Sequence, residues 1–160
     1  MRENHAELVF EKMSDERLWT FFPHLRPSSV DDLRRLYRRW QAGAAPQAPD
    51  ETWENWLCLL RTDGTPVGGA QATLFSDHEA MVAYATYTDY QRRGYTREAI
   101  SRVLAHLAHD HGVNKVRAEM DRRNEASIGV VKALGFTRSS QRAGANDLAF
   151  ELRISEATRE

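Results

Sequence analysis

This chain of 160 residues lacks several features that are typical of whole classes of protein. Its single cysteine, Cys58, cannot form an internal disulfide or anchor a cysteine-rich metal site. Its longest nearly unbroken apolar run, Ala80–Ala85, is far too short to cross a bilayer. The first residues, Met1–Met13, carry charged side chains in place of an apolar signal region. These absences favour a protein of the reducing cytoplasm with no membrane partner.

Strong net charge is also missing, because 22 basic side chains stand against 23 acidic ones. With 41% hydrophobic residues, this balance predicts a folded chain, and the length fits a single domain over residues 1–160. The charge is nevertheless uneven. Residues 1–80 hold 9 Lys and Arg against 13 Asp and Glu, whereas residues 81–160 hold 13 against 10. The asymmetry favours an anionic ligand bound by the second half.

The first fifty residues predict mainly helices. Ser14 can cap one helix, which Pro23 ends, and Ser29 can cap a second helix whose apolar residues share one face. In chain order, we expect a short strand at Leu8–Phe10, helices at Asp15–Phe22 and Val30–Gln41, and an irregular connection at Ala42–Asp50.

The remainder predicts strands and helices in mixed order. The dipeptide Asp63–Gly64 marks a hairpin turn, and the apolar residues from Ile100 to Ala108 recur at helical spacing. We expect helices at Tyr95–His111 and from Asn124 to Gly135, and strands at Trp53–Arg61, Pro66–Phe75, Glu79–Thr88, Lys115–Asp121, Phe136–Ser140 and Asp147–Ile154. This order predicts an α/β fold with a mixed sheet and one long crossover, and excludes a doubly wound parallel fold.

The segment Tyr90–Thr96 joins a strand to the amino end of the clearest helix. Such a turn leaves backbone N–H groups unpaired at the positive end of a helix dipole, where phosphates bind. Gly94 allows a close approach or an unusual backbone angle, and Arg92, Arg93 and Arg97 add positive charge. Ordinary capping with solvated arginines is the alternative. The chain has no Walker lysine motif and no triple-glycine dinucleotide fingerprint.

A second group of polar residues surrounds the start of the following helix. Glu119 lies on the preceding strand, Asn124 can cap the helix, and Ser127 lies in its first turn. A helix cap and a small residue on a crowded face would explain Asn124 and Ser127 without any function.

Together these motifs resemble the GNAT superfamily of acetyl-CoA-dependent N-acetyltransferases. One anchor is Gln91-Arg92-Arg93-Gly94-Tyr95 with Glu98-Ala99, and the other is Asn124-x-x-Ser127 running on to Leu134-Gly135-Phe136. The resemblance covers about the last hundred residues well and the first fifty poorly. The serine form of the second anchor is similar to the ribosomal-protein acetyltransferase-like branch.

The resemblance implies a mostly antiparallel sheet with a splayed central strand pair. Residues 79–140 would form the acetyl-CoA side and residues 1–52 mainly the acceptor side. Backbone amides from Arg92 to Thr96 would hold the pyrophosphate, and the pantetheine arm would lie beside a bulge at Tyr84–Thr86. The implied cofactor-binding residues are Tyr84, Ala85, Thr86, Gln91, Arg92, Arg93, Gly94, Tyr95, Thr96, Arg97, Asn124 and Ser127.

Two positions depart from the family pattern. Thr96 stands where glycine or alanine is usual in the phosphate loop, and Val131 stands where many members carry a tyrosine thought to protonate the thiolate. Ser127 or a water would then have to supply that proton.

Transfer to an amine requires a proton acceptor and a donor to the developing oxyanion. Glu119 is our first choice for the base, Glu79 the second, and a backbone N–H of Ala85 or Thr86 is the expected oxyanion donor. Direct transfer in a ternary complex needs no covalent enzyme intermediate.

Two other functions remain open. A non-catalytic acyl-CoA sensor would fit the missing tyrosine, and the basic helix Arg34–Arg39 would suit a nucleic-acid module, although the near-zero net charge argues against it. The spacing of His106, His109 and His111 places them on different faces of a helix end, so we expect no metal. We therefore expect acetyl-CoA and an amine acceptor as ligands, no nucleic acid, and possible homodimers.

Overall fold

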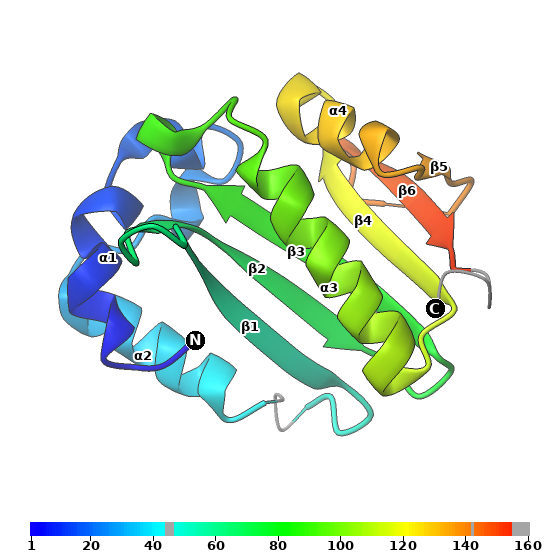
Figure 1. The fold of residues 1–160 in the computed structure, drawn as a ribbon, viewed down its shortest axis with the longest axis horizontal. Coiled ribbons are helices and arrows are strands. Elements are labelled where there is room, and N and C mark those ends of the chain that lie inside the picture. The colour runs from blue at the N-terminus through cyan, green and yellow to red at the C-terminus, as the bar shows by residue number, and fades with distance from the viewer. Residues whose placement is uncertain (44–46, 142, 155–160) are drawn as a thin grey trace.

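The computed structural model describes residues 1–43, 47–141 and 143–154. Its strands form one six-stranded sheet in the order β1-β2-β3-β4-β6-β5 (Figure 1). In chain order the elements are α1 (His5–Met13), α2 (Val30–Gln41), β1 (Thr52–Leu59), β2 (Pro66–Leu74), β3 (Glu79–Thr86), α3 (Tyr95–His111), β4 (Lys115–Asp121), α4 (Glu125–Ala133), β5 (Thr137–Arg138) and β6 (Asp147–Arg153), with 3₁₀ turns η1 (Glu16–Trp19), η2 (Pro23–Leu25) and η3 (Thr88–Tyr90).

The sheet is mostly antiparallel, as the sequence predicts. Strands β1, β2 and β3 form a meander, and β6 pairs antiparallel with both β4 and β5. Among the described strands, only β3 and β4 are parallel neighbours, and α3 makes the crossover that they require. None of the helices in the described ranges is both long enough and apolar enough to span a bilayer.

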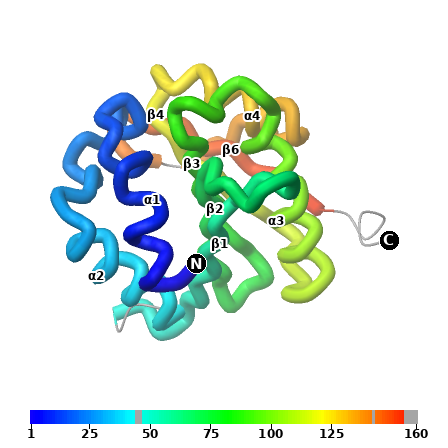
Figure 2. The backbone as a smooth tube through the Cα atoms, turned by 60° about the vertical axis from the view of Figure 1, so that its left-hand side comes forward, coloured from blue at the N-terminus to red at the C-terminus, as the bar shows by residue number. Residues whose placement is uncertain are grey.

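Helices cover both faces of the sheet. Figure 2 shows α1 and α2 on one side of the strands and α3 on the other. Ile100 and Leu107 of α3 are fully buried against the sheet, and Val9 of α1 and Leu33 of α2 are fully buried in a second apolar cluster. Burying a side chain of this size contributes roughly 1.5–3 kcal/mol. The two clusters thus fix two helical layers with the sheet between them.

Most predicted elements agree with the structure. Helices α2 and α3 and strand β4 have the predicted bounds, and the other strands differ by a few residues at their ends. Ser29 caps α2, with its hydroxyl accepting from the amide of Asp32 at 3.1 Å. Gly112, at a φ of 65°, ends α3 in the left-handed conformation.

The predictions for the first thirty residues are partly wrong. Leu8–Phe10, predicted as a strand, lies inside helix α1, because Val9 belongs to a buried stripe at helical spacing. The helix predicted at Asp15–Phe22 is only the turn η1. Ser14 does not cap it; its hydroxyl donates to the carbonyl of Phe10 at the end of α1, and Asp15 caps the turn instead. Of the predicted connection Ala42–Asp50, residues 44–46 lie outside the described ranges.

Candidate active site

Strands β3 and β4 leave a gap between their C-terminal halves. They pair only over Glu79–Met81 of β3, whereas β3 stays paired with β2 as far as Thr86. The amide of Tyr87 donates to a carbonyl of β2 at 2.9 Å, so strand alternation turns the N–H groups of Tyr84 and Thr86 away from β2 and toward the gap. Two backbone donors without a strand partner therefore face this opening.

The splayed strand pair is as expected, but the expected bulge at Tyr84–Thr86 is absent. The β2–β3 register is continuous there, and the register shift found in this part of the sheet lies between Cys58 and Leu59 in β1. Ala85 pairs with β2, so its N–H does not face the gap. Gly68 explains the close and regular pairing, because a Cβ there would lie 2.3 Å from the Ala85 carbonyl oxygen. Divergence of β4, not a bulge, opens the gap.

The loop between η3 and α3 forms a nest of backbone N–H groups. Arg92 and Gly94 have φ values of 62° and 83°, and Gly94 is an N-cap whose lack of a side chain leaves the first-turn amides of α3 uncapped. Gln91 Nε2 donates to the Thr86 carbonyl at 3.0 Å, and the hydroxyls of Thr86 and Thr96 are 2.6 Å apart. These contacts join the nest to the strand that borders the gap. Thr96, which stands where glycine or alanine is usual, thus supports the loop through its hydroxyl.

The side chains around this loop suit an anion. Arg92, Arg93 and Arg97 are all exposed, and the Arg93 guanidinium lies 5.8 Å from the centre of the Tyr90 ring. Uncapped amides, a helix dipole and three exposed arginines lie at one place, and this combination favours a bound diphosphate.

A cavity of about 730 Å³ extends from the gap to the first helices. It brings together five predicted site residues: Tyr84 and Ala85 of β3, Glu119 of β4, and Asn124 and Ser127 at the start of α4. The rest of its wall is largely apolar and aromatic. The residues from the first forty that line it include Met13, Trp19, Phe22, Leu36, Tyr37 and Trp40. The first helices therefore line the same cavity as Glu119 and the start of α4.

The start of α4 combines capping with polar groups that face the cavity. Asn124 Oδ1 accepts from the Ser127 amide at 3.1 Å, so the capping role is real, and no described residue bonds to the side-chain nitrogen of Asn124. The Tyr84 hydroxyl donates to the Ser127 carbonyl at 3.1 Å, and burial raises the pKa of Tyr84 to about 12. Val131 is buried and offers no hydroxyl. The contact of the Tyr84 side chain with α4 does not follow from the sequence, because strand alternation does not say which helix a side chain meets.

Glu79 lies apart from this group. It starts β3 at the end where β3 and β4 are still paired, and Lys115 Nζ lies 2.7 Å from its carboxylate. Arg117 Nε is 3.7 Å from the same carboxylate. The structure therefore does not bring Glu79 to the cavity, and we withdraw it as the second choice for the base.

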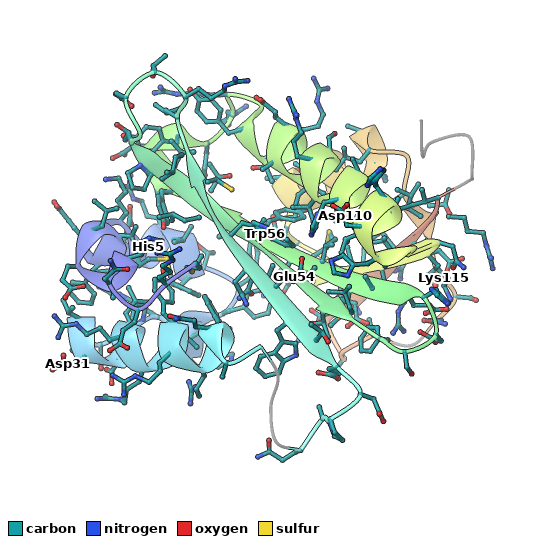
Figure 3. The ribbon with its side chains drawn as sticks, turned by 60° about the horizontal axis from the view of Figure 1, so that its bottom comes forward. His5, Asp31, Glu54, Trp56, Asp110 and Lys115 are labelled. Carbon is teal, nitrogen blue, oxygen red and sulfur yellow. The ribbon has the colours of Figure 1, made fainter. Side chains whose placement is uncertain are left out.

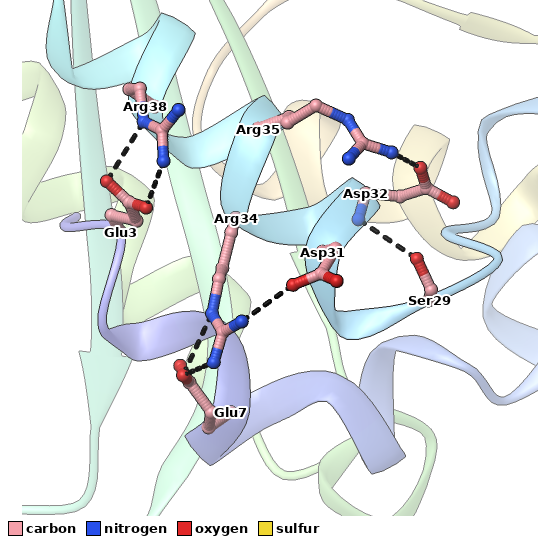
Figure 4. A network of polar contacts seen from close by, with 8 residues as sticks. All are labelled: Glu3, Glu7, Ser29, Asp31, Asp32, Arg34, Arg35 and Arg38. Carbon is pink, nitrogen blue, oxygen red and sulfur yellow. Dashed lines mark hydrogen bonds and ion pairs between the residues drawn. The ribbon is translucent and has the colours of Figure 1, made fainter.

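The arginines of α2 are mostly paired with neighbouring acids (Figure 4). The Arg34 guanidinium donates to the carboxylates of Glu7 in α1 and of Asp31, and its Nη1 lies 2.6 Å from Asp31 Oδ1. Arg35 pairs with Asp32, and Arg38 pairs with Glu3. This supports the interpretation of a solvated, neutralised helix face over a grip on nucleic acid. Arg39, by contrast, lines the cavity.

Comparison with known proteins gives a consistent result. The family model described as "Acetyltransferase (GNAT) domain" matches residues 1–137. A search of curated proteins finds no match.

Several solved structures share the fold. A GNAT-family acetyltransferase from Bacillus anthracis is 17% identical with a TM-score of 0.76, over 96% of this chain and 91% of that one. A ribosomal-protein-S5-alanine acetyltransferase from Vibrio fischeri is 15% identical with a TM-score of 0.74, over 98% and 91%. A ribosomal L7/L12 α-N-protein acetyltransferase in complex with coenzyme A is 14% identical with a TM-score of 0.76, over 96% and 91%. The neighbours thus include the branch that the serine motif indicated. On the family match over most of its length, this chain belongs to the GNAT acetyltransferase family.

Proposed function

We propose that the protein transfers the acetyl group of acetyl-CoA to a primary amine, by direct transfer within a ternary complex. One observation carries the proposal: the β3–β4 gap opens into the same cavity as Glu119, and the amide nest contacts Thr86 at the end of the strand that borders this gap, so a coenzyme and an acceptor could meet in the cavity. A family member with this arrangement needs no nucleophilic side chain of its own, since holding both reactants in one cavity suffices.

The coenzyme side of the proposal rests on hydrogen-bond donors that have no partner among the described residues. The amides from Arg92 to Thr96 would hold the diphosphate, with Arg97 and its neighbouring arginines adding charge. The backbone donors of Tyr84 and Thr86 would bond the pantetheine arm in the gap, and the amide nitrogen of Asn124 would bond it near the thioester.

The acceptor side rests on Glu119. A free alkylammonium is almost wholly protonated at neutral pH and cannot attack a carbonyl. The Glu119 carboxylate lines the cavity and, unlike Glu79, forms no ion pair with any described residue, so it can take this proton directly or through water. The N–H of Tyr84 or Thr86 would stabilise the negative charge that develops on the acetyl oxygen.

The departing sulfur also needs a proton or a hydrogen bond. Ser127 is the residue that we propose for this role, since its helix begins at the cavity and Val131 has no hydroxyl to offer. The Tyr84 hydroxyl supports the same turn of α4 through the Ser127 carbonyl.

The acceptor is an amine on a small molecule or at a protein N-terminus. The apolar aromatic wall formed by Trp19, Phe22 and Trp40 suits an acceptor with an apolar group next to its amine. Arg39 in the same wall could meet an anionic group on that acceptor.

The test is release of free CoA thiol from acetyl-CoA with a panel of apolar amines, polyamines and N-terminal peptides. We expect amine-dependent release with at least one acceptor class. Tight acetyl-CoA binding with no release for any amine would instead support the alternative of a non-catalytic acyl-CoA sensor.

A further inference from the structure

We propose that Glu54, His106 and His111 form a binding site for a divalent transition-metal ion of the Zn²⁺ type. The site lies where side chains from the last turns of α3 reach Glu54 of β1, and none of the three residues lines the acceptor cavity. It is therefore independent of the proposed acetyl transfer.

Two imidazoles converge on one carboxylate at this junction. His106 Nε2 lies 2.9 Å from Glu54 Oε2, and His111 Nε2 lies 3.0 Å from Glu54 Oε1. One ligand atom from each of the three residues lies within 4.8 Å of the others. The expectation that His111 would face elsewhere is wrong, because the last turn of α3 brings it back beside His106, with ring centres 5.0 Å apart.

The set of atoms is the kind that Zn²⁺ uses. Imidazole nitrogen and carboxylate oxygen bind this ion at about 2.0–2.2 Å, and three protein ligands leave a position open for water. Such bonds place the ligand atoms roughly 3–3.5 Å apart, so only small side-chain shifts separate the observed contacts from coordination. The side chains of Glu54, His106 and His111 are 26%, 37% and 30% exposed, which lets an ion enter from solvent.

Neighbouring groups hold His106 in the required orientation. Its other ring nitrogen, Nδ1, lies 2.5 Å from Asp110 Oδ2, and the edge of its ring meets Trp56 with centres 5.7 Å apart. Figure 3 shows Glu54 and Trp56 of β1 beside Asp110 of α3. A carboxylate on the far nitrogen of a ligating histidine fixes the tautomer and raises the basicity of the ligand.

An ion here would tie an edge strand to the helix that covers the sheet. Glu54 pairs with Ala72 of β2, and β1 forms the edge next to it. The alternative is a metal-free set of hydrogen bonds at a helix C-terminus, where cationic histidines are favourable. The two differ in their response to added metal.

The experiment uses the full chain, freed of metal by EDTA and dialysis, and titrated with Co²⁺ alone and with Zn²⁺ alone. We expect one Co²⁺ per chain with a visible d–d absorption band, displacement of Co²⁺ by Zn²⁺, and a higher melting temperature with Zn²⁺. His111→Gln should weaken Zn²⁺ binding by at least about 10-fold, and Asp110→Asn by roughly 10–100-fold, as for other outer-sphere carboxylates. Far-UV circular dichroism checks that each variant is folded.

His5→Gln is the control, because His5 lies in α1, on the other side of the strands from α3, and is outside the three-residue group. It should keep the affinity of the unsubstituted protein. Absence of both the Co²⁺ band and any heat of Zn²⁺ binding would overturn the proposal. So would equal Zn²⁺ affinity in folded His111→Gln and in the unsubstituted protein, because the ion would then bind elsewhere.

Discussion

Replacing Gly94 by alanine should weaken coenzyme A binding without any steric clash. Gly94 has a φ of 83°, and a Cβ added there would meet nothing within 4 Å. The left-handed conformation nevertheless costs an L-residue about 1–2 kcal/mol. The free protein would relieve this strain by leaving the left-handed conformation, and the amides of the nest would no longer point to one place. Coenzyme A binding would then have to return the backbone to this conformation, at the expense of affinity. The expected loss is therefore roughly 5–30-fold in Kd.

Gly64 provides a control with the same backbone strain at a different place. It lies in the turn between β1 and β2 with a φ of 75°, and a Cβ there also meets nothing within 4 Å. Gly64→Ala should lower the melting temperature by an amount similar to that for Gly94→Ala, and should leave coenzyme A affinity unchanged.

Isothermal titration calorimetry with free coenzyme A measures the difference. Gly94→Val should lose more affinity than Gly94→Ala, because a β-branched residue is a stronger outlier at positive φ. Equal coenzyme A affinity in Gly94→Ala and Gly64→Ala, with equal losses of melting temperature, would mean that the phosphates bind elsewhere.

Three further predictions concern the base, the sheet and a carboxylate. Glu119→Gln should lower turnover roughly 10²-fold or more at pH 7. The loss should be smaller at pH 9, because more of the amine is already neutral there. An equal loss at both pH values would mean that Glu119 is not the base. Gly68→Ala should lower the free energy of unfolding in urea by about 1–3 kcal/mol, because its Cβ would lie 2.3 Å from a β3 carbonyl oxygen. Gly129→Ala, in open space on α4, should raise this free energy by about 0.5–1 kcal/mol. An unchanged stability in Gly68→Ala would contradict the close approach of β2 and β3. Hydrogen bonds from the Arg123 guanidinium lower the pKa of Asp121 from 3.8 to about 2, so its charged form stabilises the fold above about pH 3.8 and this contribution is lost as the pH falls toward 2. Asp121→Asn should accordingly lower the melting temperature at pH 7, and the difference should vanish near pH 2, unlike the pH-independent loss expected of a packing defect.

The elements that sequence analysis predicts best are those with a long, repeated pattern. Helix α3 shows a buried stripe from Ile100 to Ala108 and a glycine at each end, so its bounds follow from periodicity and capping. Strand alternation and the Asp63–Gly64 turn likewise predict the meander. The short run Leu8–Phe10 predicts a strand wrongly, because three residues cannot distinguish a period of 2 from one of 3.6.

The candidate site could be predicted only where one local segment forms it. The phosphate loop is such a segment, and the structure gives it the positive φ values that a nest requires. The bulge expected at Tyr84–Thr86 follows from the family resemblance alone, since no feature of these residues predicts one. Side-chain contacts between distant segments, such as Tyr84 with Ser127 or His111 with Glu54, depend on how helices cross the sheet. Sequence spacing within a single element carries no information about that crossing.

Backbone amide shifts of ¹⁵N-labelled protein, followed by NMR during titration with coenzyme A, test the central idea most directly. Binding through main-chain donors predicts the largest changes at Arg92–Thr96, together with Tyr84 and Thr86, and none at the turn containing Gly64. Saturable binding that leaves the Arg92–Thr96 amides unmoved would contradict it.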